Sequence, residues 1–431
     1  MKYIIKTVEI RHLWKSRHVK INLNDDLNFI IGRNGSGKTT IVKAISAALL
    51  LDLETLSKID FSSIEITLRN QKDRLAASVS IDRAPPHLSG GFGFKYLVTL
   101  SNGERIQSHL DTYTGILSQT RGLGYLFPRN APVADQVSTL EISDTIRNLV
   151  EVEWLPVHRH TGSINTIFPG SEHLDSIGSK TKDTAQKISE YYSFLFNASE
   201  LSTDEFHKQV LFSYFDTSPN VNDVRPEQFT QELQKNATSA LIHFGINPKT
   251  ALYKTKQYFK FLDRSANKFR NDPSEANFED FSRLSDGARV KAITELWMKT
   301  SQRQEQITRP IDVFLNTINS MLTGKRIIFD QSNIPKVQMN DGELIDVDEL
   351  SSGERQLFII LGDTLVQRER PISFISDEPE LSLHISWQEV LFHNIRTLNE
   401  NSQIITATHS PDIISGNRSK IIRIEDFMHD D

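Results

Sequence analysis

Residues 32–40 read Gly32-Arg33-Asn34-Gly35-Ser36-Gly37-Lys38-Thr39-Thr40, and this stretch constrains the chain more than any other. The apolar run Leu27 to Ile31 precedes it and predicts a short buried strand, while the Ala-containing run Ile41 to Leu51 predicts a helix. A strand, a glycine loop and a helix in this order are the context of a P-loop, and G-x-x-x-x-G-K-[ST] is matched at every fixed position. The alternative, a glycine-rich turn with a chance lysine, does not explain the flanking strand and helix.

A P-loop binds phosphate through its backbone and through two side chains. Its glycines let the backbone curl so that successive N–H groups face phosphate oxygens, and the start of the helix near Lys38 adds its dipole. We expect Lys38 to reach the β- and γ-phosphates and the Thr39 hydroxyl to hold Mg²⁺. The expected nucleotide-binding residues of this loop are Gly32, Asn34, Gly35, Ser36, Gly37, Lys38, Thr39 and Thr40. The sequence therefore predicts a protein that binds a nucleoside triphosphate.

The composition limits the class of protein. A chain of 431 residues is long enough for two or three domains. The net charge of −6 argues against a general nucleic-acid coat, although a local basic patch would be hidden in that sum. The lack of cysteine excludes a disulfide framework, a thiolate zinc site and a cysteine nucleophile. The N-terminus lacks the apolar core of a signal peptide, and no uncharged run approaches the ~18–20 residues of a membrane helix, so we expect a soluble, cytoplasmic protein.

Patterning divides the chain into three parts, 1–170, 171–307 and 308–431. The first part predicts a β-hairpin and then an antiparallel meander, with strands at 3–10, 18–23, 63–68, 75–81 and 94–100. The middle part predicts a helical insertion, because apolar residues recur there at three- and four-residue spacing. Its expected helices are 183–198, 202–215, 226–244, 248–270 and 276–306. No sustained heptad array is present, which argues against a long antiparallel coiled-coil arm.

The middle part is rich in phenylalanine, and its periodic apolar residues predict the core of a helical bundle. The residues concerned are Phe194, Phe196, Phe206, Phe212, Phe215, Phe229, Phe244, Phe259 and Phe261. The other interpretation is that some of these faces bind another protein.

The last part alternates helices and strands, which implies a parallel sheet with right-handed crossovers. Expected helices are 311–322, 354–368 and 384–399, and expected strands are 325–329, 337–339, 372–376, 403–407 and 420–424. Asn340-Asp341-Gly342 predicts a hairpin turn, and Asp346-Val347-Asp348 a hairpin edge. The fold class is therefore α/β, with a mixed sheet, an antiparallel β-subdomain and a helical insertion.

Three motifs in the last part add to the nucleotide site. Ser351-Ser352-Gly353-Glu354 opens a helix, where small residues present backbone N–H groups to an anion. Asp377 and Glu378 end an apolar strand, Asp377 placed to hold Mg²⁺ and Glu378 to polarise the attacking water. His409 ends the next strand, where it can contact the γ-phosphate or the water. Each motif alone fits an ordinary cap, turn or surface histidine, but their order after a glycine loop favours one composite site.

This set of motifs resembles the ATP-binding-cassette (ABC) ATPases, in the branch of the SMC proteins, the Rad fifty-type repair ATPases, RecF and the OLD-like ATPases. Leu350 to Glu354 is similar to the ABC signature, and Asp377 to His384 is similar to the Walker B and D-loop run of OLD-like ATPases. The resemblance covers both ends of the chain and hardly touches the middle. A second signature-like run, Leu284 to Arg289, lacks a following Asp-Glu strand, so we do not assign it as the signature.

The resemblance implies an ABC ATPase head that hydrolyses ATP with Mg²⁺, with two subunits sandwiching two ATP molecules. The signature residues Ser351, Ser352, Gly353 and Glu354 would then contact the nucleotide bound by the partner. Lys38, Glu378 and His409 would be catalytic, and Thr39 and Asp377 would hold the metal.

Two parts of the site stay open. The run Trp154 to Arg159 is similar to a Leu-Pro-x-x-Arg run of OLD-like ATPases, so His158 or Arg159 is a candidate to couple the nucleotide to the insertion. The candidates for the adenine contact are Arg11, Trp14 and Lys15.

The resemblance also bears on partners. Many OLD-like proteins continue into a TOPRIM nuclease domain; little sequence follows His409, and no H-N-H pattern is present, so we expect any nuclease on a separate polypeptide. A stand-alone ATPase with a helical insertion is similar to the ATPase subunit of two-gene bacterial antiphage systems, the PARIS type first and the Septu type second. That similarity implies a homodimer or higher homo-oligomer that senses a phage trigger protein and controls a TOPRIM or HNH nuclease.

Two other functions remain as alternatives. A RecF-like DNA-repair ATPase would need a basic surface, for which the N-terminal hairpin offers Lys2, Lys6, Arg11, Lys15, Arg17 and Lys20. The nucleotide-binding subunit of a membrane transporter is usually shorter and lacks so large a helical insertion.

Overall fold

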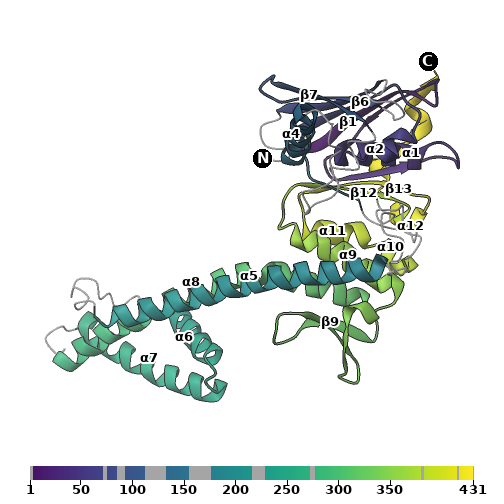
Figure 1. Cartoon of the computed structure of the whole chain (residues 1–431). Helices are drawn as coiled ribbons and strands as arrows, with labels where there is room; N and C mark the ends of the chain where they lie inside the picture. Colours follow the sequence, from purple (N-terminus) through teal and green to yellow (C-terminus); the bar gives the residue numbers. More distant parts are fainter. Residues whose placement is uncertain are drawn as a thin grey trace. The chain divides into compact units, whose positions relative to one another are not determined.

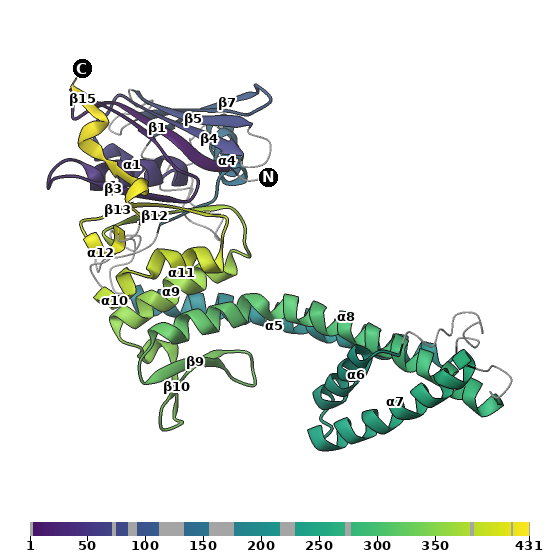
Figure 2. The same cartoon turned by 180° about the vertical axis from the view of Figure 1, so that it is seen from behind.

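The computed structural model describes residues 3–70, 75–84, 93–111, 133–154, 176–215, 229–271, 277–379, 383–414 and 417–430. These residues form two compact units, Met1–Ser189 with Val313–Asp431, and Glu190–Asp312. Figure 1 and Figure 2 show the elements of both units from opposite sides. His158 and Arg159, the candidate coupling residues, lie outside the described residues.

A seven-stranded antiparallel sheet forms one layer of the first unit (Figure 1). Its strands, in spatial order, are β15 (Met428–Asp430), β2 (Arg17–Asn22), β1 (Tyr3–Leu13), β4 (Ser63–Asn70), β5 (Ala76–Ala84), β6 (Gly93–Thr99) and β7 (Arg105–Asp111). The expected hairpin and meander are confirmed, and β7 and β15 extend them. The turn at Gly103, whose φ is +87°, returns the chain from β6 into β7. Helix α4 (Val133–Leu149) packs against β6 and β7.

A five-stranded sheet forms the next layer, and all of its strand pairs are parallel. In spatial order it contains β14 (Ile421–Arg423), β3 (Leu27–Ile31), β13 (Ser402–Ala407), β12 (Ile372–Asp377) and β8 (Val152–Trp154). The central strands β3, β12 and β13 are buried along almost their whole length, on both faces, because helices or the other sheet cover them.

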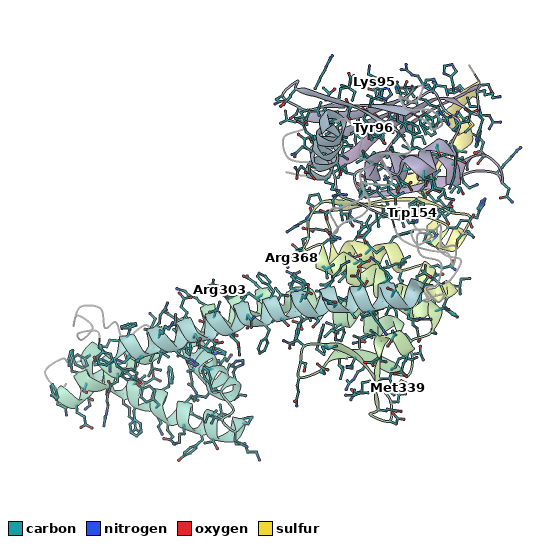
Figure 3. The ribbon with its side chains drawn as sticks, in the orientation of Figure 1. Lys95, Tyr96, Trp154, Arg303, Met339 and Arg368 are labelled. Carbon is teal, nitrogen blue, oxygen red and sulfur yellow. The ribbon has the colours of Figure 1, made fainter. Side chains whose placement is uncertain are left out.

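Helix α1 (Lys38–Leu50) lies between the two sheets and shares one hydrophobic core with both. Tyr96 of β6, labelled in Figure 3, is fully buried in that core, and its hydroxyl donates to the Ala48 carbonyl over 3.4 Å. The opposite face of the parallel sheet is covered by α9 (Ser352–Val366) and α11 (Leu391–Leu398). Short helices α2 (Leu53–Ser57), α10 (Ile385–Gln388) and α12 (Pro411–Ile414) complete the unit. The expected α/β fold with an antiparallel β-subdomain and a helical insertion is confirmed.

A small antiparallel sheet leads into α9. It consists of β9 (Lys325–Phe329), β10 (Pro335–Met339) and β11 (Leu344–Asp346), with the expected hairpin turn at Gly342. Asp346 lies at the end of β11 and pairs with Lys336, so the Asp346-Val347-Asp348 run is a hairpin edge as expected. Single 3₁₀ turns span Val347–Glu349, Arg418–Lys420 and Ile424–Asp426.

The second unit is helical. Its helices are α5 (Ser176–Ser213), α6 (Gln231–His243), α7 (Pro248–Asn271) and α8 (Phe278–Met321), of which α5 and α8 are longer than expected and extend beyond the unit along the chain. Gln304 of α8 donates to Thr203 of α5 over 2.6 Å. Helices α5 and α8 lie side by side (Figure 1 and Figure 2), a long helix pair that the sequence did not predict; the expectation against a coiled-coil arm stays a prediction. None of the described helices is both long and apolar enough to cross a membrane.

Each of the two longer helices joins segments that the sequence predicted separately. In α5 the expected helices 183–198 and 202–215 are one element, in which the Thr203 hydroxyl donates to the Ser199 carbonyl one turn earlier, as a helix interior accommodates. Helix α8 continues through Pro310 to Met321. The expected helices 276–306 and 311–322 are thus one element.

The nine phenylalanine residues that were expected in the bundle core divide into two groups. Phe206, Phe229 and Phe259 are buried, whereas the other six are exposed: Phe194, Phe196, Phe212, Phe215, Phe244 and Phe261. The expectation that they all form a bundle core was wrong for this second group. The signature-like run at 284–289 lies inside α8, where Leu284 is buried and Gly287 packs against Phe229 and Leu262.

A polar cluster connects α9 with β8 and the start of α5. Asp363 of α9 is buried; it accepts a hydrogen bond from Thr184 over 3.1 Å and pairs with Lys180 at 3.0 Å. Glu153 of β8 accepts from the Gln367 amide over 3.0 Å. Burial, and then the neighbouring Asp363 carboxylate, raise the pKa of Glu153 to about 7.

Glu153→Gln should therefore change the pH dependence of stability. In the folded protein Glu153 holds its proton up to about pH 7, whereas its ordinary pKa is 4.5. The folded state binds more protons across this range, so the group's contribution to stability falls as pH rises from the lower value to the upper one. The isosteric amide removes this loss, and we expect a gain of about 1–2 kcal/mol near pH 8 and little change near pH 5.

Thermal unfolding of the wild-type protein and the variant at the two pH values measures this effect. Glu141→Gln, which changes an exposed carboxylate of α4, is the control and should leave both values unchanged. An equal gain from Glu153→Gln at both pH values would contradict the expected proton uptake.

Candidate nucleotide-binding site

The P-loop and the ends of β12 and β13 surround one cavity of about 850 Å³. Its lining residues are Trp14, Asn34, Gly35, Gly37, Lys38, Thr39, Thr40, Glu378, His409 and Ser410. Residues separated by more than 300 positions in the sequence meet here because β3, β13 and β12 are adjacent and parallel, so their carboxyl ends lie at the same edge. The structure thus brings the glycine loop, Glu378 and His409 together.

The loop has the conformation that its glycines permit. Gly35 and Gly37 have φ values of +80° and +99°, in the left-handed region that favours glycine. A Cβ at Gly37 would also lie 2.5 Å from the Trp14 ring, so both the backbone conformation and this close approach exclude a side chain at position 37. Helix α1 begins at Lys38 without a side-chain cap, which leaves its first N–H groups for a ligand.

The Lys38 ammonium is buried beside the loop. Lys38 is 6% exposed, and its Nζ donates to the carbonyls of Gly32 and Arg33 over 2.9 and 3.0 Å. The Ser36 hydroxyl is also buried, and no hydrogen-bond partner satisfies it within the described part of the chain. A buried cation and an unsatisfied hydroxyl beside open N–H groups suit a polyphosphate.

Thr39 and Asp377 meet at the floor of the site. The Thr39 hydroxyl, in the first turn of α1, donates to Asp377 Oδ1 at the end of β12 over 2.9 Å. A hydroxyl and a carboxylate oxygen are hard ligands of the kind that Mg²⁺ prefers. The two residues expected to hold the metal therefore lie in contact, and this donor set fits Mg²⁺ with a nucleotide.

Glu378 and His409 face the same cavity from adjacent strands. The Glu378 N–H donates to the Ala407 carbonyl over 2.8 Å, and its φ of +51° is unusual for a residue with a side chain. His409 follows β13 and is exposed in the cavity wall. A carboxylate in this position can accept a proton from a water molecule near the phosphates, and an imidazole can hydrogen-bond to that water or to a phosphate.

Glu425 also contacts the P-loop and was not anticipated from the sequence. Its carboxylate accepts from the Arg33 N–H over 2.7 Å, and this hydrogen bond is the main cause that lowers the pKa of Glu425. Both Ile424 and Glu425 lie within 3 Å of where a Cβ on Gly32 would be. The only signal in the sequence was that Glu425 follows the strand expected at 420–424.

The signature residues lie apart from this cavity. Ser351 caps α9: its hydroxyl accepts from the Glu354 N–H, and its own N–H donates to Glu354 Oε2 over 3.0 Å. Burial works to raise the pKa of Glu354, but hydrogen bonds from Ser351 and the pair with Lys325 outweigh it and lower that pKa. None of Ser351, Ser352, Gly353 and Glu354 is among the residues that line the cavity.

Of the three candidates for the adenine contact, only Trp14 lines the cavity. Its ring lies against Gly37, and the Arg17 guanidinium is 5.4 Å from the ring centroid. Arg11 instead pairs with Glu9 at 2.8 Å.

Solved structures with partial similarity include SMC heads. The chain resembles the Smc head domain with an extended coiled coil from Pyrococcus furiosus, which was solved bound to the C-terminal domain of ScpA. The two share 14% identity and a TM-score of 0.41, and the comparison covers 96% of this chain and 91% of the Smc chain. It also resembles the Smc head domain with a coiled coil and joint from Pyrococcus yayanosii, with 15% identity and a TM-score of 0.39. That comparison covers 96% of this chain and 93% of the Smc chain.

A protein-family comparison covers most of the chain. The family described as AAA ATPase domain matches residues 1–81 and 164–414, which include the P-loop, Asp377, Glu378 and His409. Together with the cavity that these residues form, this match identifies the chain as a member of the AAA ATPase domain family.

Proposed function

We propose that the protein is an ATP-hydrolysing switch in which two copies of the chain close around two molecules of ATP. The observation that carries this proposal is the division of the site. The phosphate, metal and water-handling residues share one cavity, whereas the signature residues lie outside it. An ABC-type dimer explains both facts, because each signature then serves the nucleotide of the other copy.

The residues of the cavity have distinct roles in this proposal. Lys38 neutralises the phosphates, and Thr39 and Asp377 would hold Mg²⁺, which would supply further neutralisation of the phosphate charge. Glu378 accepts the proton of the attacking water, and His409 orients that water or the γ-phosphate. Trp14 stacks on the base, since its ring is the aromatic surface in the cavity wall.

The signature residues act on the partner's nucleotide. Ser351 and Ser352 are exposed at the start of α9, where the helix dipole favours an anion, although the capping box already uses the N–H groups of Ser351 and Glu354. ATP completes this contact and hydrolysis weakens it, so the nucleotide state controls closure.

We further propose that closure controls a separate nuclease in an antiphage system, with a phage protein as the trigger. This role rests on the motif resemblance to OLD-like ATPases. The seven exposed phenylalanines in the described part of the second unit, the six named above and Phe278, support it, because exposed aromatic side chains are frequent in protein interfaces.

A DNA-acting repair ATPase is the second candidate, but the basic patch expected from the sequence does not support it. Lys6 pairs with Asp25 at 2.6 Å, and Arg11 and Lys20 both pair with Glu9 at 2.8 and 3.0 Å. These two carboxylates compensate part of the charge, and Lys2 lies outside the described residues. A different basic surface, on α7, favours this candidate and is described below.

Glu378→Gln should keep ATP binding and stop hydrolysis. The amide preserves the shape of the side chain but cannot accept the proton, so we expect kcat to fall by about 10²-fold or more.

Lys38→Ala should instead weaken ATP binding, because it removes the cation beside the phosphates. Glu389→Gln, an exposed carboxylate outside the cavity, is the control and should hydrolyse ATP normally. Steady-state ATPase assays and equilibrium ATP binding measure both effects, and a fully active Glu378→Gln variant would refute the assigned base.

Mixing two inactive variants tests whether the signature acts across the dimer. Ser351→Asp keeps a helix-capping side chain but places a negative charge where the partner's phosphate would lie. It should abolish hydrolysis, and the neutral cap Ser351→Asn should not. An equal mixture of Ser351→Asp with Lys38→Ala should recover about a quarter of the wild-type activity, since half of the dimers are mixed and each of these has one intact site. Mixed dimers that show no recovery would place the signature in its own chain's site.

Affinity purification from the native host tests what the switch controls. We expect a nuclease polypeptide to co-purify with the chain, and Glu378→Gln to change the amount recovered, because the variant holds one nucleotide state. Mass spectrometry and nuclease assays of the purified material provide the readout. Recovery of DNA without any nuclease would instead support the repair function.

A further inference from the structure

Helix α7 carries a strong positive charge in a chain that is negative overall. Between Pro248 and Asn271 it has five lysines and two arginines against a single acidic residue, Asp263. The whole chain has a net charge of −6. A basic stretch on one element of an acidic protein indicates a local binding surface for an anion.

One face of α7 is fixed by packing. Phe259, Leu262 and Ala266 are buried in a core with α6 residues Leu233 and Ala237, as the adjacent α6 and α7 in Figure 2 illustrate. The apolar face of this helix is therefore already covered within the second unit.

The opposite face forms a continuous basic stripe. Its residues are all exposed and are spaced by three or four positions: Lys249, Tyr253, Lys256, Lys260 and Arg264. This spacing places them in one row along the helix, over ~22 Å at 1.5 Å per residue. Exposed Lys254 and Phe261 flank the row.

The charges of the stripe are not compensated by the protein. No ion pair within the described ranges involves Lys249, Lys256, Lys260 or Arg264. By contrast, Lys268 on the same helix pairs with Asp280 at 2.9 Å. Like charges three or four residues apart repel, so a linear anion along the stripe would relieve that repulsion.

We propose that this stripe binds the phosphate backbone of a nucleic acid. A row of cations over this length matches several consecutive phosphates, which recur every ~3.4 Å of axis along one strand. Tyr253 is 66% exposed beside the cations and can stack on an unpaired base, whereas the Phe261 ring already lies against the Arg264 and Arg283 guanidiniums. An amphipathic helix binds a membrane by inserting its apolar face, and α7 has that face buried in the core.

The test measures how nucleic-acid affinity depends on salt. A labelled single-stranded oligonucleotide and its duplex are titrated with the full-length protein and with the triple variant Lys256→Ala, Lys260→Ala, Arg264→Ala. Each lost phosphate contact lowers the slope of log K against log salt by about 0.7 for single strands and 0.9 for duplex, so we expect a decrease of about 2–3. The affinity at low salt should fall by at least about 10-fold.

A matched control removes the same charge from other helices of the second unit. Lys208→Ala, Lys235→Ala, Lys299→Ala changes three exposed lysines on α5, α6 and α8 and should keep the wild-type slope. Basal ATPase activity should be unchanged in both triple variants, which shows that they are folded. The proposal is overturned if the wild-type protein binds neither oligonucleotide at low salt, if both triple variants lose binding equally, or if only anionic phospholipid vesicles are bound.

Discussion

The parallel pairing of β3, β13 and β12 is the interaction on which the site depends. Ile30 of β3 pairs with Ala407 of β13, and Ala407 pairs with Asp377 of β12. A shift of this register would move the P-loop away from Asp377 and Glu378. Buried amides help to hold it: Asn28 donates to the Ile404 carbonyl over 3.2 Å, and Gln403 donates to the Ile5 carbonyl over 2.7 Å. Because such buried groups are costly to leave unpaired, they favour this one alignment.

Buried polar contacts also connect α9, which begins at the expected signature residues, with α5 and β8. Helix α9 begins at the Ser351 cap and carries Asp363, which contacts Lys180 of α5. A displacement of α9 must therefore strain or rearrange a buried set of charges. Burial and the neighbouring Asp363 carboxylate raise the pKa of Glu153, so a change in the separation of the two groups would alter the free energy of protonating Glu153.

The sequence predicted the structure best where a strand is buried on both faces, because such a strand must be largely apolar. The apolar runs of β3, β12 and β13 and the fixed positions of the P-loop predicted the strands and the loop–helix junction correctly. It was less informative where the structure depends on particular hydrogen bonds of side chains, either within one helix or between residues far apart in the sequence. Thr203 lies in a helix because its hydroxyl bonds within that helix, and Glu425 reaches the P-loop from the other end of the chain. Apolar spacing also could not show that Phe212 and Phe215 are exposed within the described part of the chain, because periodicity gives a helix face but not its neighbour.

The position of Lys38 has a consequence for how a ligand would be received. Its ammonium is already held by two carbonyls of its own loop, and its side chain is buried. A free lysine loses up to about 2 kcal/mol of rotamer entropy when it becomes ordered. Here folding has already ordered the side chain, so the site is preorganised, and a nucleotide meets a fixed cation whose hydrogen bonds are exchanged rather than newly formed.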